Sequence, residues 1–73
     1  MPTGRIKFFD ERKGFGFIKP DEPGPEAYIP QFAVEAAGIQ GFKPSQRVFY
    51  QLAHWHPIMG RPIVGSLCLI EEE

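Results

Sequence analysis

Proline and glycine residues constrain the fold of this chain more than any other feature. Eight prolines and eight glycines divide its 73 residues into short apolar runs, and long helices are excluded because proline breaks them. β-Branched and aromatic residues, which favour strands, are frequent in five runs: residues 4–10, 14–19, 27–30, 46–54 and 62–70. Residues 31–37 contain good helix formers and precede Gly38, a natural helix stop. The pattern predicts an all-β fold, a small five-stranded antiparallel barrel with one helical turn, as a single domain of residues 1–73.

The size and composition of the chain exclude several classes of protein. A chain this short forms one thin core and has little room for a catalytic cleft, and no nucleophile–base or paired-carboxylate arrangement is present. We expect no enzymatic activity and no cofactor. There is no apolar run of about 18 residues and no signal-peptide pattern, so a cytoplasmic protein without membrane contact is expected. Cys68 is the only cysteine and, within an apolar run, is predicted to be a small core residue.

Charge is distributed unevenly along the sequence. The formal net charge is −1, which is unlike that of a basic nucleic-acid-binding protein. Residues 1–20, however, contain five basic and two acidic residues, a net charge of +3, whereas residues 21–73 contain three basic and seven acidic residues, a net charge of −4. The positive potential is therefore local to the first predicted hairpin.

The segment from Lys13 to Ile18 carries the most specific pattern. Its order is Lys-Gly-Phe-Gly-Phe-Ile, and strand alternation places Phe15 and Phe17 on one face and the glycines and Ile18 on the other. Two adjacent exposed rings flanked by lysines form a surface on which bases can stack. Core packing of the two phenylalanines is the alternative, but Ile18 and the glycines already supply a rival core face. We therefore predict a base-stacking surface.

Five segments, taken together, resemble a known family. They are residues 4–10, 13–18, 26–29, 41–43 and 60–62, and in order and spacing they are similar to the bacterial cold-shock proteins. The aromatic-glycine motif also occurs in RNA-recognition motif domains, but there it lies late in a longer chain. The resemblance implies an OB-type barrel without a cofactor that binds single-stranded RNA or DNA, usually pyrimidine-rich, and acts as an RNA chaperone or expression regulator.

The resemblance also implies which residues bind. Its ring positions correspond to Phe8, Phe15, Phe17, Tyr28 and Phe42, and its phosphate-facing cations to Lys7, Lys13 and Arg61. Asp10 replaces an asparagine, so this position can only accept hydrogen bonds and repels phosphate. Strict alternation would put Phe8 on the same face as Ile6, a predicted core residue, so an outward Phe8 requires a twist or bulge.

Two segments depart from the family pattern. After Tyr28 the chain reads Ile-Pro-Gln-Phe, where the family has a histidine followed by an aromatic residue. Phe32 either supplies the missing ring or faces inward from the helical turn. The last connection, residues 54–59, is apolar instead of glycine-rich. Its two histidines could approach one metal ion, but further ligands are missing, and Trp55 is predicted to be core in preference to a stacking platform or partner contact.

These observations leave two hypotheses of function. In the first, the protein is a single-strand nucleic-acid binder that uses the rings and cations named above. In the second, it is a protein-interaction or dimerisation module with a cold-shock-like barrel that has lost most nucleic-acid affinity, and the apolar 54–59 segment is its docking surface. The expected partner is single-stranded RNA or DNA, and the chain is a monomer or a homodimer.

Overall fold

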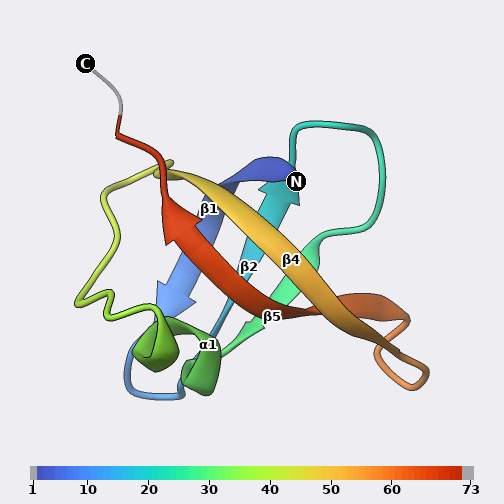
Figure 1. Cartoon of the computed structure of the whole chain (residues 1–73). Coiled ribbons are helices and arrows are strands. Elements are labelled where there is room, and N and C mark those ends of the chain that lie inside the picture. Colours follow the sequence, from blue (N-terminus) through green and yellow to red (C-terminus); the bar gives the residue numbers. More distant parts are fainter. Residues whose placement is uncertain (1, 72–73) are drawn as a thin grey trace.

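The computed structural model describes residues 2–71 as five strands and one short helix (Figure 1). In chain order these are β1 (Thr3–Asp10), β2 (Phe15–Pro20), β3 (Ala27–Pro30), α1 (Gln31–Ala36), β4 (Arg47–His56) and β5 (Arg61–Leu69). All five predicted strands and the helical turn are present, and their ends differ from the predicted ends by at most two residues. The predicted all-β class is thereby confirmed.

The strands form a closed barrel in the order β1-β2-β3-β5-β4, and β4 also pairs with β1. Four of these five pairings within residues 2–71 are antiparallel, whereas β3 and β5 run parallel where Tyr28 lies opposite Ile63. A closed ring with an odd number of strands cannot alternate direction throughout, so at least one pair must be parallel. This geometry brings the start of β5 beside β3.

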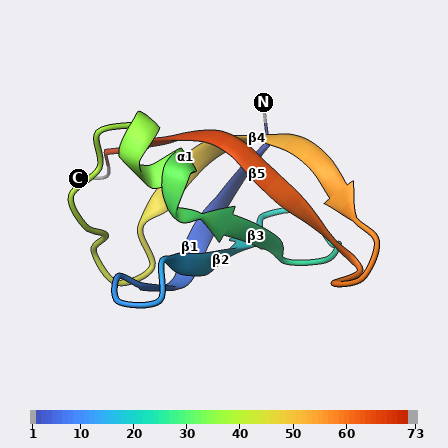
Figure 2. The same cartoon turned by 90° about the horizontal axis from the view of Figure 1, so that it is seen from below.

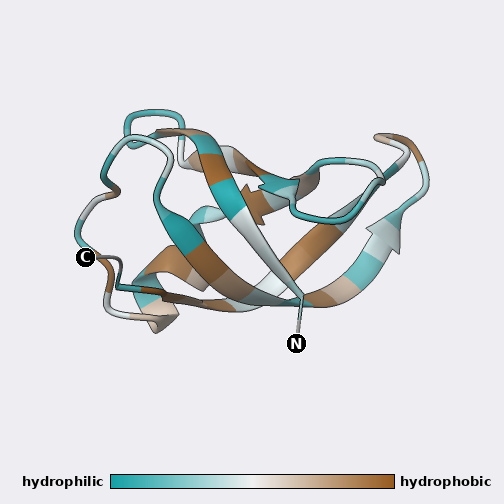
Figure 3. Cartoon of the chain, turned by 90° about the horizontal axis from the view of Figure 1, so that it is seen from above, coloured by the Kyte–Doolittle hydropathy of each residue, from teal (hydrophilic) through white to brown (hydrophobic). Residues whose placement is uncertain are grey.

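Small and branched apolar side chains fill the barrel. Ile18, Ile29, Val48 and Val64 are fully buried, and Figure 3 shows apolar stretches of the strands interspersed with polar ones. Helix α1 packs Ala33 and Val34 into this core and covers one end of the barrel beside β3 and β5 (Figure 2). Pro30 ends β3 and serves as the N-cap residue of α1, so it terminates the strand instead of interrupting it.

A bulge in β1 turns Phe8 outward. The pairing of β1 with β2 shifts register between Ile6 and Phe8, so Ile6 is buried in the core while Phe8 is 42% exposed. An extra residue in one strand reverses the side-chain alternation beyond it. The bulge that an outward Phe8 requires is therefore present.

Two core predictions are wrong. Trp55 is 55% exposed, because the hairpin of β4 and β5 extends beyond the body of the barrel (Figure 1) and has no opposing sheet to pack against. Cys68 is exposed, because β5 turns Leu67 into the core and its neighbour therefore points outward.

One histidine of the β4–β5 hairpin takes part in its turn. His56 accepts a hydrogen bond on Nδ1 from the backbone N–H of Met59 (3.1 Å), which shapes the turn. Within residues 2–71, no three His, Cys, Asp or Glu side chains come together to hold a metal ion. The same residues include no helix of the length and apolarity needed to cross a membrane.

Candidate nucleic-acid interface

Four aromatic rings meet on the outer face of β1, β2 and β3. The strand register produces this row directly, since Phe8 lies opposite Phe17 and Phe17 lies opposite Tyr28. Phe15 is two residues before Phe17 and so shares its face. We call this set of Phe8, Phe15, Phe17 and Tyr28 the ring cluster.

The rings of the cluster are in contact and partly open to solvent. Phe17 is central, with ring centroids 5.4 Å from Phe8, 6.0 Å from Phe15 and 5.8 Å from Tyr28. Phe15 and Tyr28 are nearly parallel, with an interplanar angle of 9° and a centroid distance of 5.9 Å. Contiguous rings with accessible faces suit the stacking of successive bases. Phe15 and Phe17 are only partly buried, so they are not packed in the core, which was the alternative prediction for them.

Gly16 allows the two strands beneath the cluster to approach closely. A Cβ atom at this position would lie 2.7 Å from Cδ2 of Phe9 and would also collide with the carbonyl oxygen of Phe8. Only glycine fits opposite the bulged part of β1. Gly16 thus helps to hold Phe8 beside Phe17.

A carboxylate lies among the predicted phosphate-binding cations. The Arg61 guanidinium carbon is 4.8 Å from the centroid of Phe17, a cation–π contact. Glu26 forms ion pairs with both basic residues at the edge of the cluster: its Oε2 is 3.0 Å from Lys7 Nζ and its Oε1 is 3.8 Å from Arg61 Nη1. Any anion that binds these two cations would have to compete with Glu26. Glu26 was not among the predicted site residues, although it immediately precedes the Ala-Tyr pair of β3.

Asp10 builds the turn between β1 and β2. Its Oδ1 accepts hydrogen bonds from the backbone N–H groups of Arg12 and Lys13, both at 3.0 Å. The turn closes at Gly14, whose φ of 76° favours glycine and whose N–H donates to the Asp10 carbonyl. Lys13 is exposed in this turn, two residues before Phe15. The acceptor-only character of Asp10 is thus used within the protein.

Phe42 lies beside the ring cluster without joining it. Its ring contacts Phe9 at a centroid distance of 5.7 Å and packs against the core. It also lines, with Lys7, Phe8 and Lys43, a hollow of about 230 Å³. Phe42 therefore adjoins Phe8 across this hollow. Lys43 was not among the predicted site residues, although it directly follows Phe42 in the sequence.

Phe32 projects from α1 into solvent and is 59% exposed, so the inward-facing alternative is wrong. Within residues 2–71 its ring contacts none of the cluster rings. At the start of α1, however, it follows Pro30, which lies opposite Phe15 in the β2–β3 pairing. Phe32 therefore lies near the end of the cluster that Phe15 forms.

Comparison with known proteins identifies the family. The model of the 'Cold-shock' DNA-binding domain matches residues 2–57, well over half of the chain. The chain therefore belongs to the cold-shock domain family. Nucleic-acid binding is typical of this family, whose domains are not enzymes. The matched residues 2–57 contain the whole ring cluster. Strand β5, which includes Arg61, lies after them.

Several bacterial relatives show the same similarity. "Probable cold shock protein y4cH" of Sinorhizobium fredii is 42% identical over 52 residues, which cover 71% of this chain and 75% of that protein. "Cold shock protein CspA" of Rhizobium meliloti is 38% identical over the same shares of the two chains. "Cold shock-like protein CspE" of Escherichia coli is 31% identical over 51 residues, which cover 70% of this chain and 74% of its own.

Proposed function

We propose that this cold-shock domain binds single-stranded RNA or DNA by stacking bases on the ring cluster while Lys7, Lys13 and Arg61 contact phosphates. The observation that carries the proposal is the unbroken contact of four partly exposed rings across three strands. A preference for pyrimidine-rich strands and a role as RNA chaperone or expression regulator follow from the family resemblance. The proposed activity is binding alone and uses no cofactor.

Stacking supplies most of the affinity in this proposal. Each base stacked on an aromatic side chain contributes about 1–3 kcal/mol, whereas exposed cations near phosphates contribute less and are screened by salt. With three phosphate contacts to a single strand, a plot of log K against log[salt] should have a slope of about −2. The acidic remainder of the chain keeps long-range attraction weak.

Fluorescence anisotropy of a labelled oligothymidine tests the proposal. Saturable binding that weakens with salt is expected, and Phe15→Ala or Phe17→Ala should lower the affinity about 5- to 150-fold, the equivalent of one lost stacking contact. Phe49→Ala is the matched control, because Phe49 is an exposed phenylalanine on β4, outside the cluster.

Unchanged affinity in both cluster variants would contradict stacking. Absence of binding to oligothymidine, mixed-sequence DNA and RNA, with the protein folded, would contradict the proposal as a whole and favour the interaction module.

A further inference from the structure

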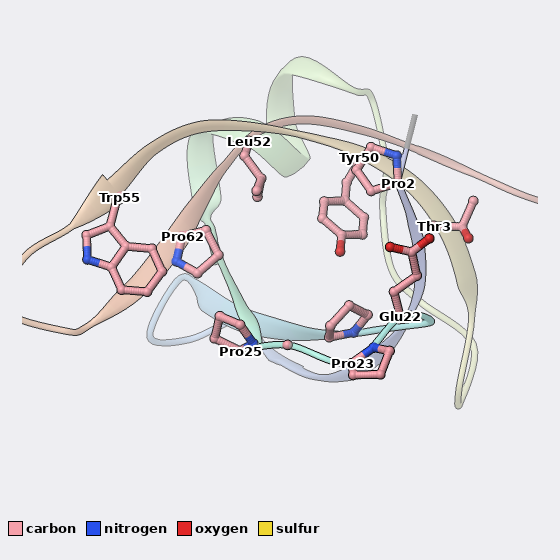
Figure 4. A pocket seen from close by; sticks show the side chains of 11 residues that line it. Pro2, Thr3, Glu22, Pro23, Pro25, Tyr50, Leu52, Trp55 and Pro62 are labelled. Carbon is pink, nitrogen blue, oxygen red and sulfur yellow. The ribbon is translucent and has the colours of Figure 1, made fainter.

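A second candidate site lies at the end of the barrel that α1 does not cover. Here a cavity of about 570 Å³ separates the β4–β5 strands from the loop that precedes β3 (Figure 4). Volumes of about 300–1,000 Å³ are typical of ligand sites. We call this cavity the end pocket, and its principal lining residues are Glu22, Pro23, Tyr50, Leu52, Trp55 and Pro62.

The irregular pairing of β4 directs Trp55 to this pocket. Tyr50 and Leu52 are two residues apart and share a face, but the pairing with β5 shifts register on both sides of Leu52. Beyond the shift, the side chains of β4 alternate in the opposite sense. Trp55, three residues after Leu52, therefore points to the same side as Leu52, toward the pocket (Figure 4). An exposed indole and a buried phenol thus lie along one wall, and prolines form much of the opposite wall.

A tyrosine hydroxyl and a carboxylate face the pocket. Only 4% of Tyr50 is exposed, yet its hydroxyl points into the cavity (Figure 4), and no hydrogen bond to it occurs within residues 2–71. The carboxylate of Glu22 lies at the same end of the pocket. Burial raises the pKa of Tyr50, and the charges of Asp21 and Glu22 raise it further. The hydroxyl is therefore a neutral donor in a negative field.

We propose that the end pocket docks a proline-rich segment of a partner protein that carries an arginine. Polyproline II segments bind aromatic-lined grooves, and their backbone carbonyls have no internal hydrogen bonds, so one can accept from the Tyr50 hydroxyl. The arginine pairs with the Glu22 carboxylate. The proline wall has fixed backbone angles, which lowers the ordering cost of binding.

Charge complementarity selects this partner over a nucleic acid. Glu22 lines the pocket and repels phosphate, whereas the charge of the neighbouring Asp21 is offset by its ion pair with Arg47 (3.1 Å). The ring cluster lies on β1–β3, while the apolar wall of the end pocket lies on β4 and β5. The site is thus independent of the proposed nucleic-acid function.

Trp55 is the only tryptophan of the chain, so its emission reports on the pocket directly. Titration with the peptide acetyl-Pro-Pro-Arg-Pro-Pro-amide should give a saturable blue shift, and the same peptide with glutamate in place of arginine should give none. Glu22→Gln and Tyr50→Phe should each weaken binding about fivefold. Phe15→Ala, outside the pocket, should leave peptide binding unchanged while it lowers the affinity for oligothymidine.

Several results would overturn the proposal. One is a folded protein whose Trp55 emission does not respond to millimolar arginine peptide, and another is equal binding of the arginine and glutamate peptides. Arginine amide that binds as tightly as the peptide would assign the pocket to a small cation. An emission shift on concentration of the protein alone would assign it to a second copy. Quenching by oligothymidine that persists in Phe15→Ala would assign it to nucleic acid.

Discussion

The carboxylate of Glu26 contacts Lys7 and Arg61, two of the three cations proposed to hold phosphates. Replacing it by glutamine removes the competing charge while it keeps the shape of the side chain. Glu26→Gln should therefore raise the affinity for oligothymidine at low salt by up to about fivefold, which corresponds to an exposed ion pair of about 0.2–1 kcal/mol. Anisotropy titration of the variant measures the change.

Glu35→Gln is the control for net charge. Glu35 is an exposed residue of α1 whose carboxylate accepts from the side chain of Gln31, so its loss changes the total charge equally but does not release Lys7 or Arg61. If both variants bind with the same affinity, the effect of Glu26 is not local and its proposed competition with phosphate is wrong.

Asp10 should matter for stability through its acceptor oxygen. Asp10→Ala removes the acceptor of two backbone N–H groups and should lower the free energy of unfolding by about 1–2 kcal/mol. Asp10→Asn keeps an oxygen in the same place and should unfold close to the parent protein. Urea denaturation followed by circular dichroism measures both variants. An equal loss in the two would show that charge, not the turn hydrogen bonds, is responsible.

Single-residue predictions succeeded where the strand pattern decides the side of a residue. Phe15, Phe17 and Tyr28 meet because alternation and register place them together. The contacts of Glu26 could not be predicted, because Arg61 reaches it only through the parallel pairing of β3 with β5. Phe42 lies in a segment without regular secondary structure, so no periodicity indicates its direction. The predicted binding roles of all these residues stay predictions.

At the scale of elements, the pairing of β1 with β2 depends on Gly16. Gly16→Ala would force its new Cβ into Phe8 and Phe9, and we expect a loss of about 1–3 kcal/mol, typical of overpacking. Phe8 should also move, with weaker oligothymidine binding. Denaturation and anisotropy measure the two effects.

Gly24→Ala is the matched control for this substitution. A Cβ at Gly24 meets no atom within 4 Å, and its φ is not positive, so stability should be unchanged or slightly increased. An equal loss in both variants would contradict the role of close packing at Gly16.

The strands themselves could be predicted because glycine, proline and β-branched residues mark their ends and interiors. Their irregularities were harder. The bulge before Phe8 followed from a conflict between alternation and the family resemblance. The register shifts around Leu52 that direct Trp55 were not predicted, although the pairing there skips Gly65, and an isolated glycine within a strand often marks a bulge. Cys68 lies in an uninterrupted apolar run, and such a run does not reveal which residues face inward.

The whole molecule has a small core, so single core residues carry a large share of its stability. Ile18 is fully buried beneath the ring cluster, and Ile18→Ala should lower the free energy of unfolding by about 2–5 kcal/mol. For a domain of this size, the thermal midpoint should fall by at least about 8 °C. Ser66→Ala, on the exposed side of β5, should leave the midpoint nearly unchanged.

A ligand that binds only the folded barrel should restore part of this loss. Oligothymidine at 100 times its dissociation constant should add about 2.7 kcal/mol to the stability of Ile18→Ala, so the thermal midpoint should rise when the strand is present. The same addition to Phe15→Ala at equal oligonucleotide concentration should raise the midpoint less, because stacking is weaker. Thermal unfolding with and without oligothymidine measures both. A midpoint of Ile18→Ala that does not respond would mean that the small barrel and its ring cluster do not bind the strand as one folded unit.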